Sequence, residues 1–265
     1  MRKMKPVPKS QKERLKQADR LKDSNSEKPV KMENEESLQD LQQSILFEDS
    51  RFLILNKPSG MAVHGGSGLS YGVIEGLRAL RPDAPYLELA HRLDRDTSGC
   101  LVIAKRRSAL RAFHKQQQEG RVNKFYLVLI KDQWKGGTRK IKAPLLKKEL
   151  KSGERIVRVD PQGKHAISSF APIERFKQAT LMRVKLITGR THQIRVHAQH
   201  AGHPIAGDTK YGDASFNQKM SELGLQRLYL HAESIHFTLP DINTYDIRAP
   251  LDASLEELLT KLEKL

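Results

Sequence analysis

The chain has 265 residues, of which 38% are hydrophobic, and this is enough to bury one large core. The single cysteine, Cys100, excludes an internal disulfide and a zinc cluster of cysteines, and its apolar neighbours predict a small core residue. No uncharged run is apolar enough for a membrane span or a signal peptide, so we expect a cytoplasmic protein that does not contact membranes.

The net charge is +16, and most of the excess lies in the middle of the chain. Residues 105–155 hold 16 Lys and Arg against four Asp and Glu, whereas residues 1–44 hold 11 against eight. A basic block of this density attracts polyanions regardless of their sequence, and the attraction weakens with salt. Only 6% of the residues are aromatic, which favours folded RNA over stacked single strands as the partner. A solvated basic face is the alternative.

The N-terminal arm, residues 1–44, is polar and mixed in charge, so we predict that it is disordered or loosely helical. Leu38 and Leu41 indicate a short helix at its end. One folded domain is expected over residues 45–265, with no separate RNA-binding domain ahead of it.

Folded structure is predicted to begin with a hairpin of Ile45–Phe47 and Phe52–Leu55. The glycine-rich stretch after it has neither P-loop nor dinucleotide-fold spacing, so a flexible loop is favoured over a phosphate cradle. Residues 70–80 predict a helix with Ser70 as its N-cap. A second helix is predicted over Ser108–Glu119, ended by Gly120.

Asn123–Ile130 alternates in the strand period with apolar residues on both faces, which predicts a central strand. Shorter strands are indicated near 155–159, 167–170, 181–187 and 227–237, and a last helix near 254–264. Many hairpin-linked strands with few helices between them predict an α+β fold with a mostly antiparallel mixed sheet flanked by helices.

A polar loop, His91-Arg92-Leu93-Asp94-Arg95-Asp96-Thr97-Ser98-Gly99, lies between two apolar runs of strand length, Tyr86–Ala90 and Cys100–Ala104. Its last residues favour a turn, so the loop is held at both ends by sheet. Such a loop carries a carboxylate, two guanidinium groups and an imidazole on a rigid support, where binding and catalytic residues are often found. Alternatively, Asp94 and Asp96 only cap the backbone of the turn.

A helix is predicted to begin after Thr191, its N-cap, and to end before Gly202, with an apolar face directed to the core. Arg195 then lies about one turn from the helix N-terminus. The guanidinium and the helix dipole both attract an anion, and a nearby Arg typically lowers an Asp pKa by about 1–3 units. A carboxylate brought to this point would stay ionised.

The loop sequence HRLDRDTSG resembles the signature of the RluA-type pseudouridine synthases, which isomerise uridine to pseudouridine in folded RNA. Four further stretches resemble motifs of that family in the same order: Asn56–Gly60 (NKPSG), Lys124–Tyr126 (KFY), Gly189–Arg195 (GRTHQIR) and Leu230–Ala232 (LHA). The stretch VHGGSGLSYGVIEGLRALRP brings the resemblance closer to the RluC-like branch, which acts on large-subunit ribosomal RNA.

The resemblance implies an isomerase with the pseudouridine synthase catalytic fold and no cofactor. It implies that Asp94 is the nucleophile, that Arg195 pairs with it, and that Tyr126 stacks on the target base and accepts a proton. Substrate binding is expected from Arg92, Lys57, Arg190, Thr191 and His192. Arg92 is the candidate to fill the space that the flipped base leaves. The expected partner of this monomer is RNA, either 23S ribosomal RNA or a pre-50S particle.

Other interpretations remain open at this point. A ribosome-associated RNA-binding protein of the same fold without catalysis would need none of the three catalytic side chains. Asp94 and Asp96 have the spacing of a magnesium pair for nuclease chemistry. His192, His197, His200 and His203 are close in sequence, but only His197 and His200 share a helix face, which disfavours a zinc site.

Overall fold

The computed structural model describes residues 35–65, 72–149, 155–241 and 243–265, and a compact unit begins at Glu36. Its helices are α2 (Glu35–Gln43), α3 (Val73–Leu80), α4 (Arg107–Gln118), α5 (Gln193–His200), α6 (Ala214–Glu222) and α7 (Ala253–Lys261). Its strands are β1 (Ile45–Glu48), β2 (Phe52–Lys57), β3 (Glu88–Leu89), β4 (Ser98–Ala104), β5 (Asn123–Lys131), β6 (Arg139–Lys142), β7 (Leu145–Glu149), β8 (Arg155–Val159), β9 (Ile167–Arg175), β10 (Ala179–Leu186), β11 (Leu230–Thr238) and β12 (Thr244–Arg248).

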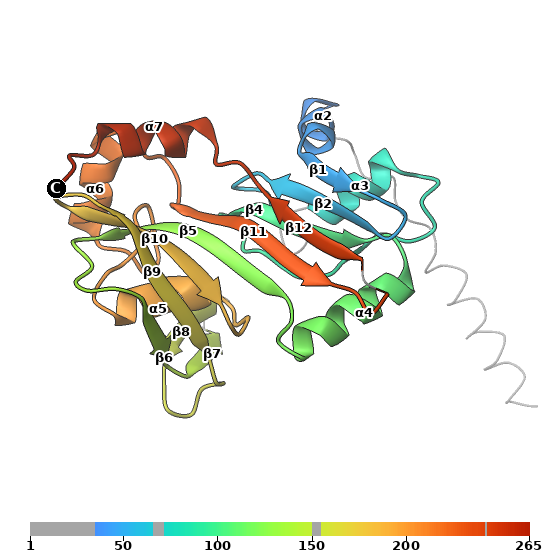
Figure 1. The fold of residues 1–265 in the computed structure, drawn as a ribbon. Coiled ribbons are helices and arrows are strands. Elements are labelled where there is room, and N and C mark those ends of the chain that lie inside the picture. The colour runs from blue at the N-terminus through green and yellow to red at the C-terminus, as the bar shows by residue number, and fades with distance from the viewer. Residues whose placement is uncertain (1–34, 66–71, 150–154, 242) are drawn as a thin grey trace, which may run out of the picture. The chain divides into compact units, whose positions relative to one another are not determined.

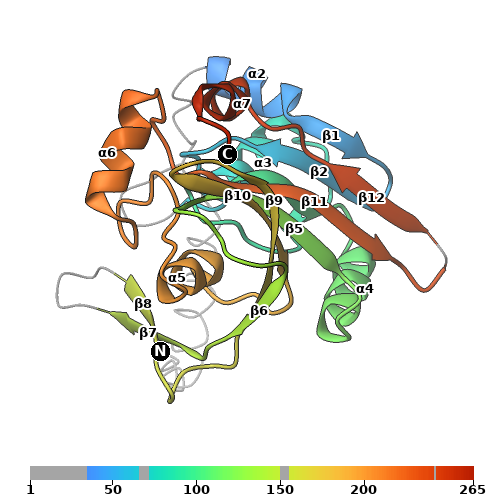
Figure 2. The ribbon, with the colours of Figure 1, turned by 60° about the vertical axis from the view of Figure 1, so that its left-hand side comes forward.

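Ten of the described strands form one sheet in the order β1-β2-β4-β11-β5-β10-β9-β6, with β3 joined to β4 and β12 joined to β11 (Figures 1 and 2). Strands β4 and β11 run parallel, and the other pairs in this sheet are antiparallel. Strands β7 and β8 form a separate hairpin. The predicted α+β class with a mostly antiparallel sheet is confirmed.

Strand β5 occupies the middle of the sheet between β11 and β10, as the apolar residues on both of its faces predict. Tyr126, Val128 and Ile130 alternate onto one face and are buried. The predicted hairpin of β1 and β2 is confirmed, as is the helix α4 followed by Gly120 in the left-handed conformation. Cys100 is 2% exposed, which confirms the prediction of a core residue.

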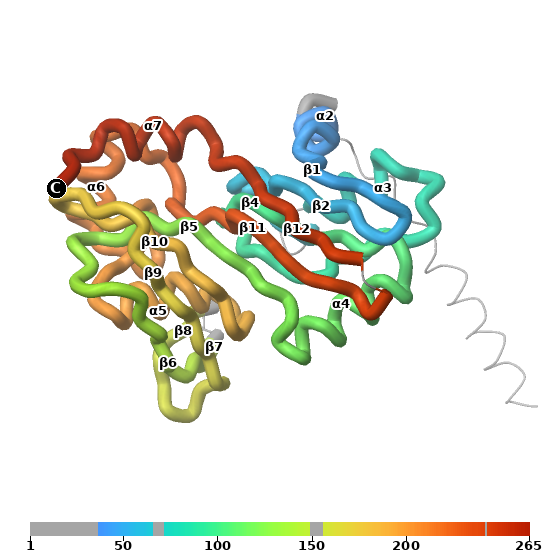
Figure 3. Tube along the Cα trace, in the orientation of Figure 1, coloured from blue at the N-terminus to red at the C-terminus, as the bar shows by residue number. Residues whose placement is uncertain are grey.

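Helices and distant strands close around this sheet. Helix α4 packs on β4, and α5 lies against β8 and β9 (Figure 2). The tube view shows the C-terminal strand β12 beside the N-terminal strand β1 (Figure 3). The Tyr245 hydroxyl on β12 donates a hydrogen bond to Asp49 Oδ2 at 2.9 Å, just after β1. The two ends of the unit are therefore joined through the sheet.

Some predicted boundaries shift. Leu38 and Leu41 do lie in a short helix, α2, and both are buried. The N-cap of α3 is Gly72, whose N–H donates to the Glu75 carboxylate at 3.0 Å, and the predicted N-cap Ser70 lies outside the described residues. None of the helices in the described ranges is both long and apolar enough to cross a membrane.

Candidate active site

Three distant parts of the chain meet in one cleft of about 810 Å³. Asp94 reaches it from the loop between β3 and β4, Tyr126 from β5 and Arg195 from α5. Four of the predicted substrate-binding residues also line it: Arg92, Arg190, Thr191 and His192. The three predicted catalytic side chains therefore share one cavity.

The loop that carries Asp94 is fixed from the side of β2. The Thr97 N–H donates to the Asp94 carbonyl at 3.1 Å, which closes the turn. The Ser59 hydroxyl donates to the Asp96 carbonyl at 2.8 Å, and the Gly60 N–H donates to the Arg95 carbonyl at 2.9 Å. The loop backbone is thus held by the segment after β2.

Lys57 supports this loop and is not among the residues that line the cleft, so the geometry gives no support to the prediction that it binds substrate directly. Its side chain is fully buried, and its ammonium donates to the carbonyls of Pro58, Met61 and Arg95 at 2.8–2.9 Å. Burial lowers the pKa of Lys57 to about 7. The three N–H bonds of its charged form are all used by backbone carbonyls, which explains why this lysine lies inside the fold.

The far end of the loop is fixed by β11. Gly99 has φ +108°, and a Cβ at this position would lie 2.3 Å from the Ala232 carbonyl oxygen. The neighbouring Ser98 hydroxyl lies 2.9 Å from Nδ1 of His231, whose Nε2–H donates to the Ala249 carbonyl at 3.1 Å. A side chain at residue 99 would force β4 and β11 apart, so glycine is required here.

Arg195 pairs with Asp208, whereas the sequence predicts that it pairs with Asp94. Its Nε and Nη2 donate to the two carboxylate oxygens of Asp208 at 2.7 Å each, and the two side chains are 7% and 1% exposed. Burial acts to raise the pKa of Asp208, but the Arg195 hydrogen bonds hold it below its usual range. The Asp94 charge still contributes to raising the pKa of Arg195, so the two groups are electrostatically coupled.

Asp208 escaped sequence analysis because it follows the apolar pair Ile205-Ala206 in a turn, and no spacing motif links it to Arg195. Its carboxylate also accepts the N–H groups of Lys210 and Tyr211 at 2.9 Å. The turn is thus organised around a buried anion, which only the folded structure reveals.

Tyr126 is 5% exposed and lines the cleft. Burial, and then the Asp94 charge, raise the pKa of its phenol, so it is neutral at physiological pH. Its hydroxyl has no hydrogen-bond partner among the residues that the structure describes. A neutral ring with an available hydroxyl is suited to contact a planar base.

Two other residues that line the cleft, His91 and Lys124, make contacts within the protein. Nε2 of His91 accepts the Val102 N–H at 3.2 Å, and its ring stacks on Phe113 at 6.1 Å between centroids. Burial holds the pKa of His91 well below its ordinary value. The Lys124 ammonium donates to Gln117 at 2.5 Å, and burial lowers its pKa to about 8. The first residue of the loop signature is therefore structural.

The predicted N-cap Thr191 is wrong, because α5 begins after His192. The end of that helix is confirmed, since Gly202 follows its C-cap with φ +82°.

Two arginines lie at the rim of the cleft. Arg190 Nε donates to the His165 carbonyl at 3.1 Å, and Arg92 is exposed in the cleft wall. These two guanidinium groups give the cleft a cationic rim.

Three of the four histidines considered for zinc contact different groups. His192 lies beside Tyr211, His197 between Ser168 and the Ala143 carbonyl, and His203 against the Lys131 carbonyl. Within the described ranges, no three or more His, Cys, Asp or Glu side chains are grouped as metal ligands would be.

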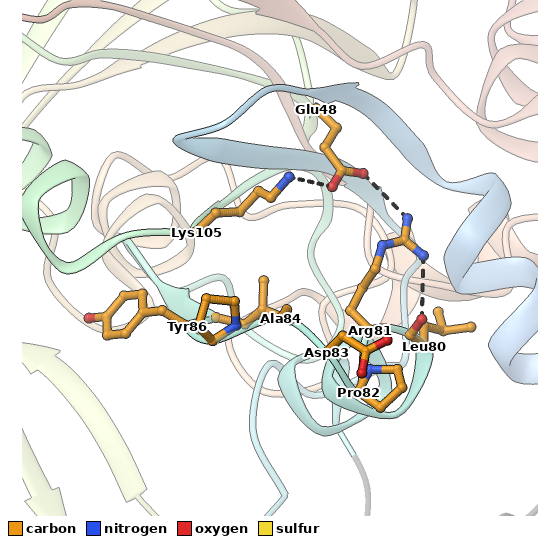
Figure 4. Close-up of a pocket in the computed structure, with 10 residues that line it drawn as sticks. Glu48, Leu80, Arg81, Pro82, Asp83, Ala84, Tyr86 and Lys105 are labelled. Carbon is orange, nitrogen blue, oxygen red and sulfur yellow. Dashed lines mark hydrogen bonds and ion pairs between the residues drawn. The ribbon is translucent and has the colours of Figure 1, made fainter.

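A smaller pocket of about 330 Å³ lies near β1 and the segment after α3 (Figure 4). Its two cations, Arg81 and Lys105, both pair with Glu48, at 3.3 Å and 2.6 Å. Because both cations are already engaged by the Glu48 carboxylate, the larger cleft, which Asp94, Tyr126 and Arg195 line, is the candidate active site.

Comparison with known proteins decides the family. The model of the RNA pseudouridylate synthase family matches residues 51–200, a segment that includes Asp94, Tyr126 and Arg195. The ribosomal large subunit pseudouridine synthase C of Pasteurella multocida is 54% identical over 225 residues, covering 84% of this chain and 69% of the relative. That of Escherichia coli is 53% identical over 221 residues, covering 82% and 69%. The chain belongs to the RNA pseudouridylate synthase family.

Solved structures agree on the fold of this family. Human RNA Pseudouridylate Synthase Domain Containing 4 has a TM-score of 0.70 and 24% identity, covering 86% of this chain and 96% of that chain. Human RNA Pseudouridylate Synthase Domain Containing 1 has a TM-score of 0.69 and 24% identity, covering 84% and 88%. The α+β architecture described above is the pseudouridylate synthase fold.

Proposed function

We propose that this pseudouridylate synthase family member isomerises uridine to pseudouridine in large-subunit ribosomal RNA, with Asp94 as its nucleophile. The observation that carries the proposal is the shared cleft of Asp94, Tyr126 and Arg195. The relatives at 53–56% identity are named for activity on the large ribosomal subunit, which supports this RNA as the substrate. We further propose 23S RNA or a pre-50S particle as the target of a cytoplasmic monomer.

The reaction needs a nucleophile, an anion-stabilising setting and a surface that holds uracil. The Asp94 carboxylate attacks the uridine at the ring or at the anomeric carbon, and the glycosidic bond breaks. The uracil turns while still held, and its carbon 5 bonds to the sugar. A base removes the proton on carbon 5, N1 of the uracil gains a proton where the sugar was attached, and Asp94 is released, so the product is an isomer of the substrate.

Arg195 serves this chemistry by its charge. The two carboxylate oxygens of Asp208 accept from Nε and Nη2, which form one edge of the guanidinium, so Arg195 acts on Asp94 through space as part of a fixed ion pair. Tyr126 supplies a face for stacking on the uracil. Its raised phenol pKa means that it holds its own proton at neutral pH, which favours stacking over proton acceptance.

Arg92 is proposed to enter the RNA stack when the target uridine leaves it. The side chain is exposed, lies two residues before Asp94 and lines the same cleft. A planar guanidinium can stack on bases and contact phosphate together, and unstacking a base costs a few kcal/mol. Arg92→Ala should therefore reduce turnover on folded RNA far more than on an unpaired substrate, and equal losses on both would argue against this role.

The decisive assay measures tritium released from ribosomal RNA that is labelled at carbon 5 of uridine. The parent protein should release tritium, and Asp94→Asn should abolish release while RNA binding persists. Asp96→Asn is the matched control, because Asp96 lies on the same loop with its carboxylate paired to Arg95 at 3.2 Å. No release from the parent protein would indicate a binding protein without catalysis, and magnesium-dependent shortening of the RNA would indicate a nuclease.

A further inference from the structure

His192 adopts a backbone conformation that is unfavourable for its residue type. Its φ and ψ are 51° and 20°, in the left-handed region, and it is the N-cap of α5 without a capping hydrogen bond from its side chain. Such a conformation is unfavourable for a residue with a Cβ, because the Cβ lies too close to the following carbonyl oxygen. Strain of this kind at an active site calls for a functional reason.

The strained backbone places the imidazole between two groups of the cleft. Nε2 of His192 lies 3.9 Å from Oδ2 of Asp94, and Nδ1 lies 2.8 Å from the Tyr211 hydroxyl. The first distance is longer than a hydrogen bond, but contacts of this kind often shorten when the substrate binds. His192 therefore approaches the nucleophile with a polar ring atom, while Arg195 is engaged with Asp208.

Tyr211 is held on three sides. Its hydroxyl accepts the Val157 N–H at 3.0 Å, and its own N–H donates to Asp208 at 2.9 Å. The Arg195 guanidinium lies 5.0 Å from the centre of its ring. The side chain is 4% exposed within a small apolar cluster. The phenol oxygen is therefore a fixed point from which the imidazole of His192 can be oriented.

These contacts favour one of the two neutral tautomers of His192. The Tyr211 oxygen already accepts from Val157, and its single O–H has Nδ1 of His192 as its acceptor among the described residues. Nδ1 is then an acceptor, and the ring proton is on Nε2, which faces Asp94. The opposite arrangement would direct a lone pair at the Asp94 carboxylate, which is repulsive.

We propose that Tyr211 and His192 are positioning residues for Asp94. The Tyr211 hydroxyl fixes His192 as the Nε2–H tautomer, and this N–H holds Oδ2 of Asp94 so that the other oxygen is presented to the uridine. The assignment of Asp94 as nucleophile rests on the proposed function, whereas the tautomer of His192 does not.

The imidazole is suited to this task because it is neutral. Burial lowers the pKa of His192, and the Asp94 charge opposes that shift. A neutral N–H orients the carboxylate without neutralising it, whereas protonation at low pH would create an ion pair that weakens the nucleophile. The charged and titratable groups around the ring are Asp94, Arg195, Asp208, Lys210 and Tyr211.

The first test reads the tautomer directly by nitrogen-15 NMR of protein labelled in histidine, with His192→Asn to assign the signal. The parent should show the Nε2–H tautomer, and Tyr211→Phe should give a mixture. Tyr229→Phe is the control, because the buried Tyr229 hydroxyl donates to the Leu255 carbonyl on α7 at 3.2 Å and Tyr229 is not among the residues that line the cleft. An Nδ1–H tautomer in the parent, or an unchanged signal in Tyr211→Phe, would overturn the proposal.

The second test measures turnover. Tyr211→Phe should lower kcat by up to about 100-fold, as a small misplacement of a reacting group can, with KM little changed and the acid limb of the pH profile shifted. An unaltered kcat and pH profile would refute the role. If the parent releases no tritium, the proposed function fails, and the NMR result still decides the tautomer.

The third test removes the unfavourable backbone conformation of residue 192. Glycine adopts the left-handed conformation without cost, so His192→Gly should unfold at the same or a higher urea concentration than the parent while its kcat falls. A variant that is less stable yet fully active would show that His192 serves the fold and not the nucleophile.

Discussion

Asp208→Asn tests the buried ion pair most sharply. The variant keeps the size of the side chain and an oxygen for the N–H groups of Lys210 and Tyr211, but it leaves Arg195 as an uncompensated buried charge. Removing one partner of a buried pair typically costs about 3–5 kcal/mol. For a unit of this size each kcal/mol shifts Tm by roughly 2–4 °C, so we expect a loss of roughly 6–20 °C.

The assay is unfolding by heat, which gives Tm, and by urea, which gives the midpoint and slope, both at neutral pH and followed by circular dichroism. Glu263→Gln is the control, because its partner Lys177 and Glu263 itself are 60% and 71% exposed, so no shift of the midpoint is expected. The double variant Arg195→Met/Asp208→Asn removes the unpaired charge and should recover part of the stability lost in Asp208→Asn. The double variant should release no tritium from labelled RNA, because the positive charge of Arg195 near Asp94 is gone.

Two outcomes would refute this reasoning. An Asp208→Asn protein with the midpoint and slope of the parent would mean that the pair does not stabilise the fold. A double variant less stable than Asp208→Asn would mean that the cost came from lost packing and not from the unpaired charge.

Three further experiments test the contacts of buried residues that support the site and the fold. Gly99→Ala should lower the free energy of unfolding by at least about 1–3 kcal/mol, because a Cβ meets Ala232 and φ is positive; an unchanged urea midpoint would contradict the close approach of the strands. Lys57→Met removes a hydrogen-bond donor from the carbonyls of Pro58, Met61 and Arg95, of which Arg95 keeps the Gly60 N–H, and should cost about 1–3 kcal/mol, with turnover reduced as the loop loosens; full activity and stability would argue against its supporting role. Burial lowers the pKa of His197 and His231, so as the pH falls these histidines are protonated in the unfolded state before the folded state. The free energy of unfolding should therefore decrease below about pH 6.5, by up to about 1.4 kcal/mol per pH unit for each histidine. A free energy of unfolding that is constant between about pH 7 and 5 would contradict this.

Hydrophobic periodicity and turn residues correctly predicted those elements that depend on interactions within a few residues. The alternation in Asn123–Lys131 identified the central strand, and the helix signals identified α4 and the end of α5. The loop of Asp94 was located from turn chemistry between apolar runs. Periodicity and turn preferences act within a few residues, so they can be read from the chain alone.

What escaped prediction depends on contacts between distant segments. Arg195 was expected to pair with Asp94, but Asp208, thirteen residues on, accepts from Nε and Nη2 along one edge of the guanidinium. Lys57 was expected at the substrate, but three carbonyls around it bind its ammonium inside the fold. The N-cap of α5 is His192 and not Thr191, because His192 adopts a left-handed backbone conformation that the sequence does not predict.

The parallel pairing of β4 with β11 has a consequence for synthesis of the chain. Asp94 leaves the ribosome early, but the register of Ser98 with His231 and of Gly99 with Ala232 forms only after more than a hundred further residues have followed. Until then the loop lacks the strand that holds its far end. In a nascent chain the loop of Asp94 is therefore supported on one side only, and its full set of contacts forms late in translation, once β11 is in place.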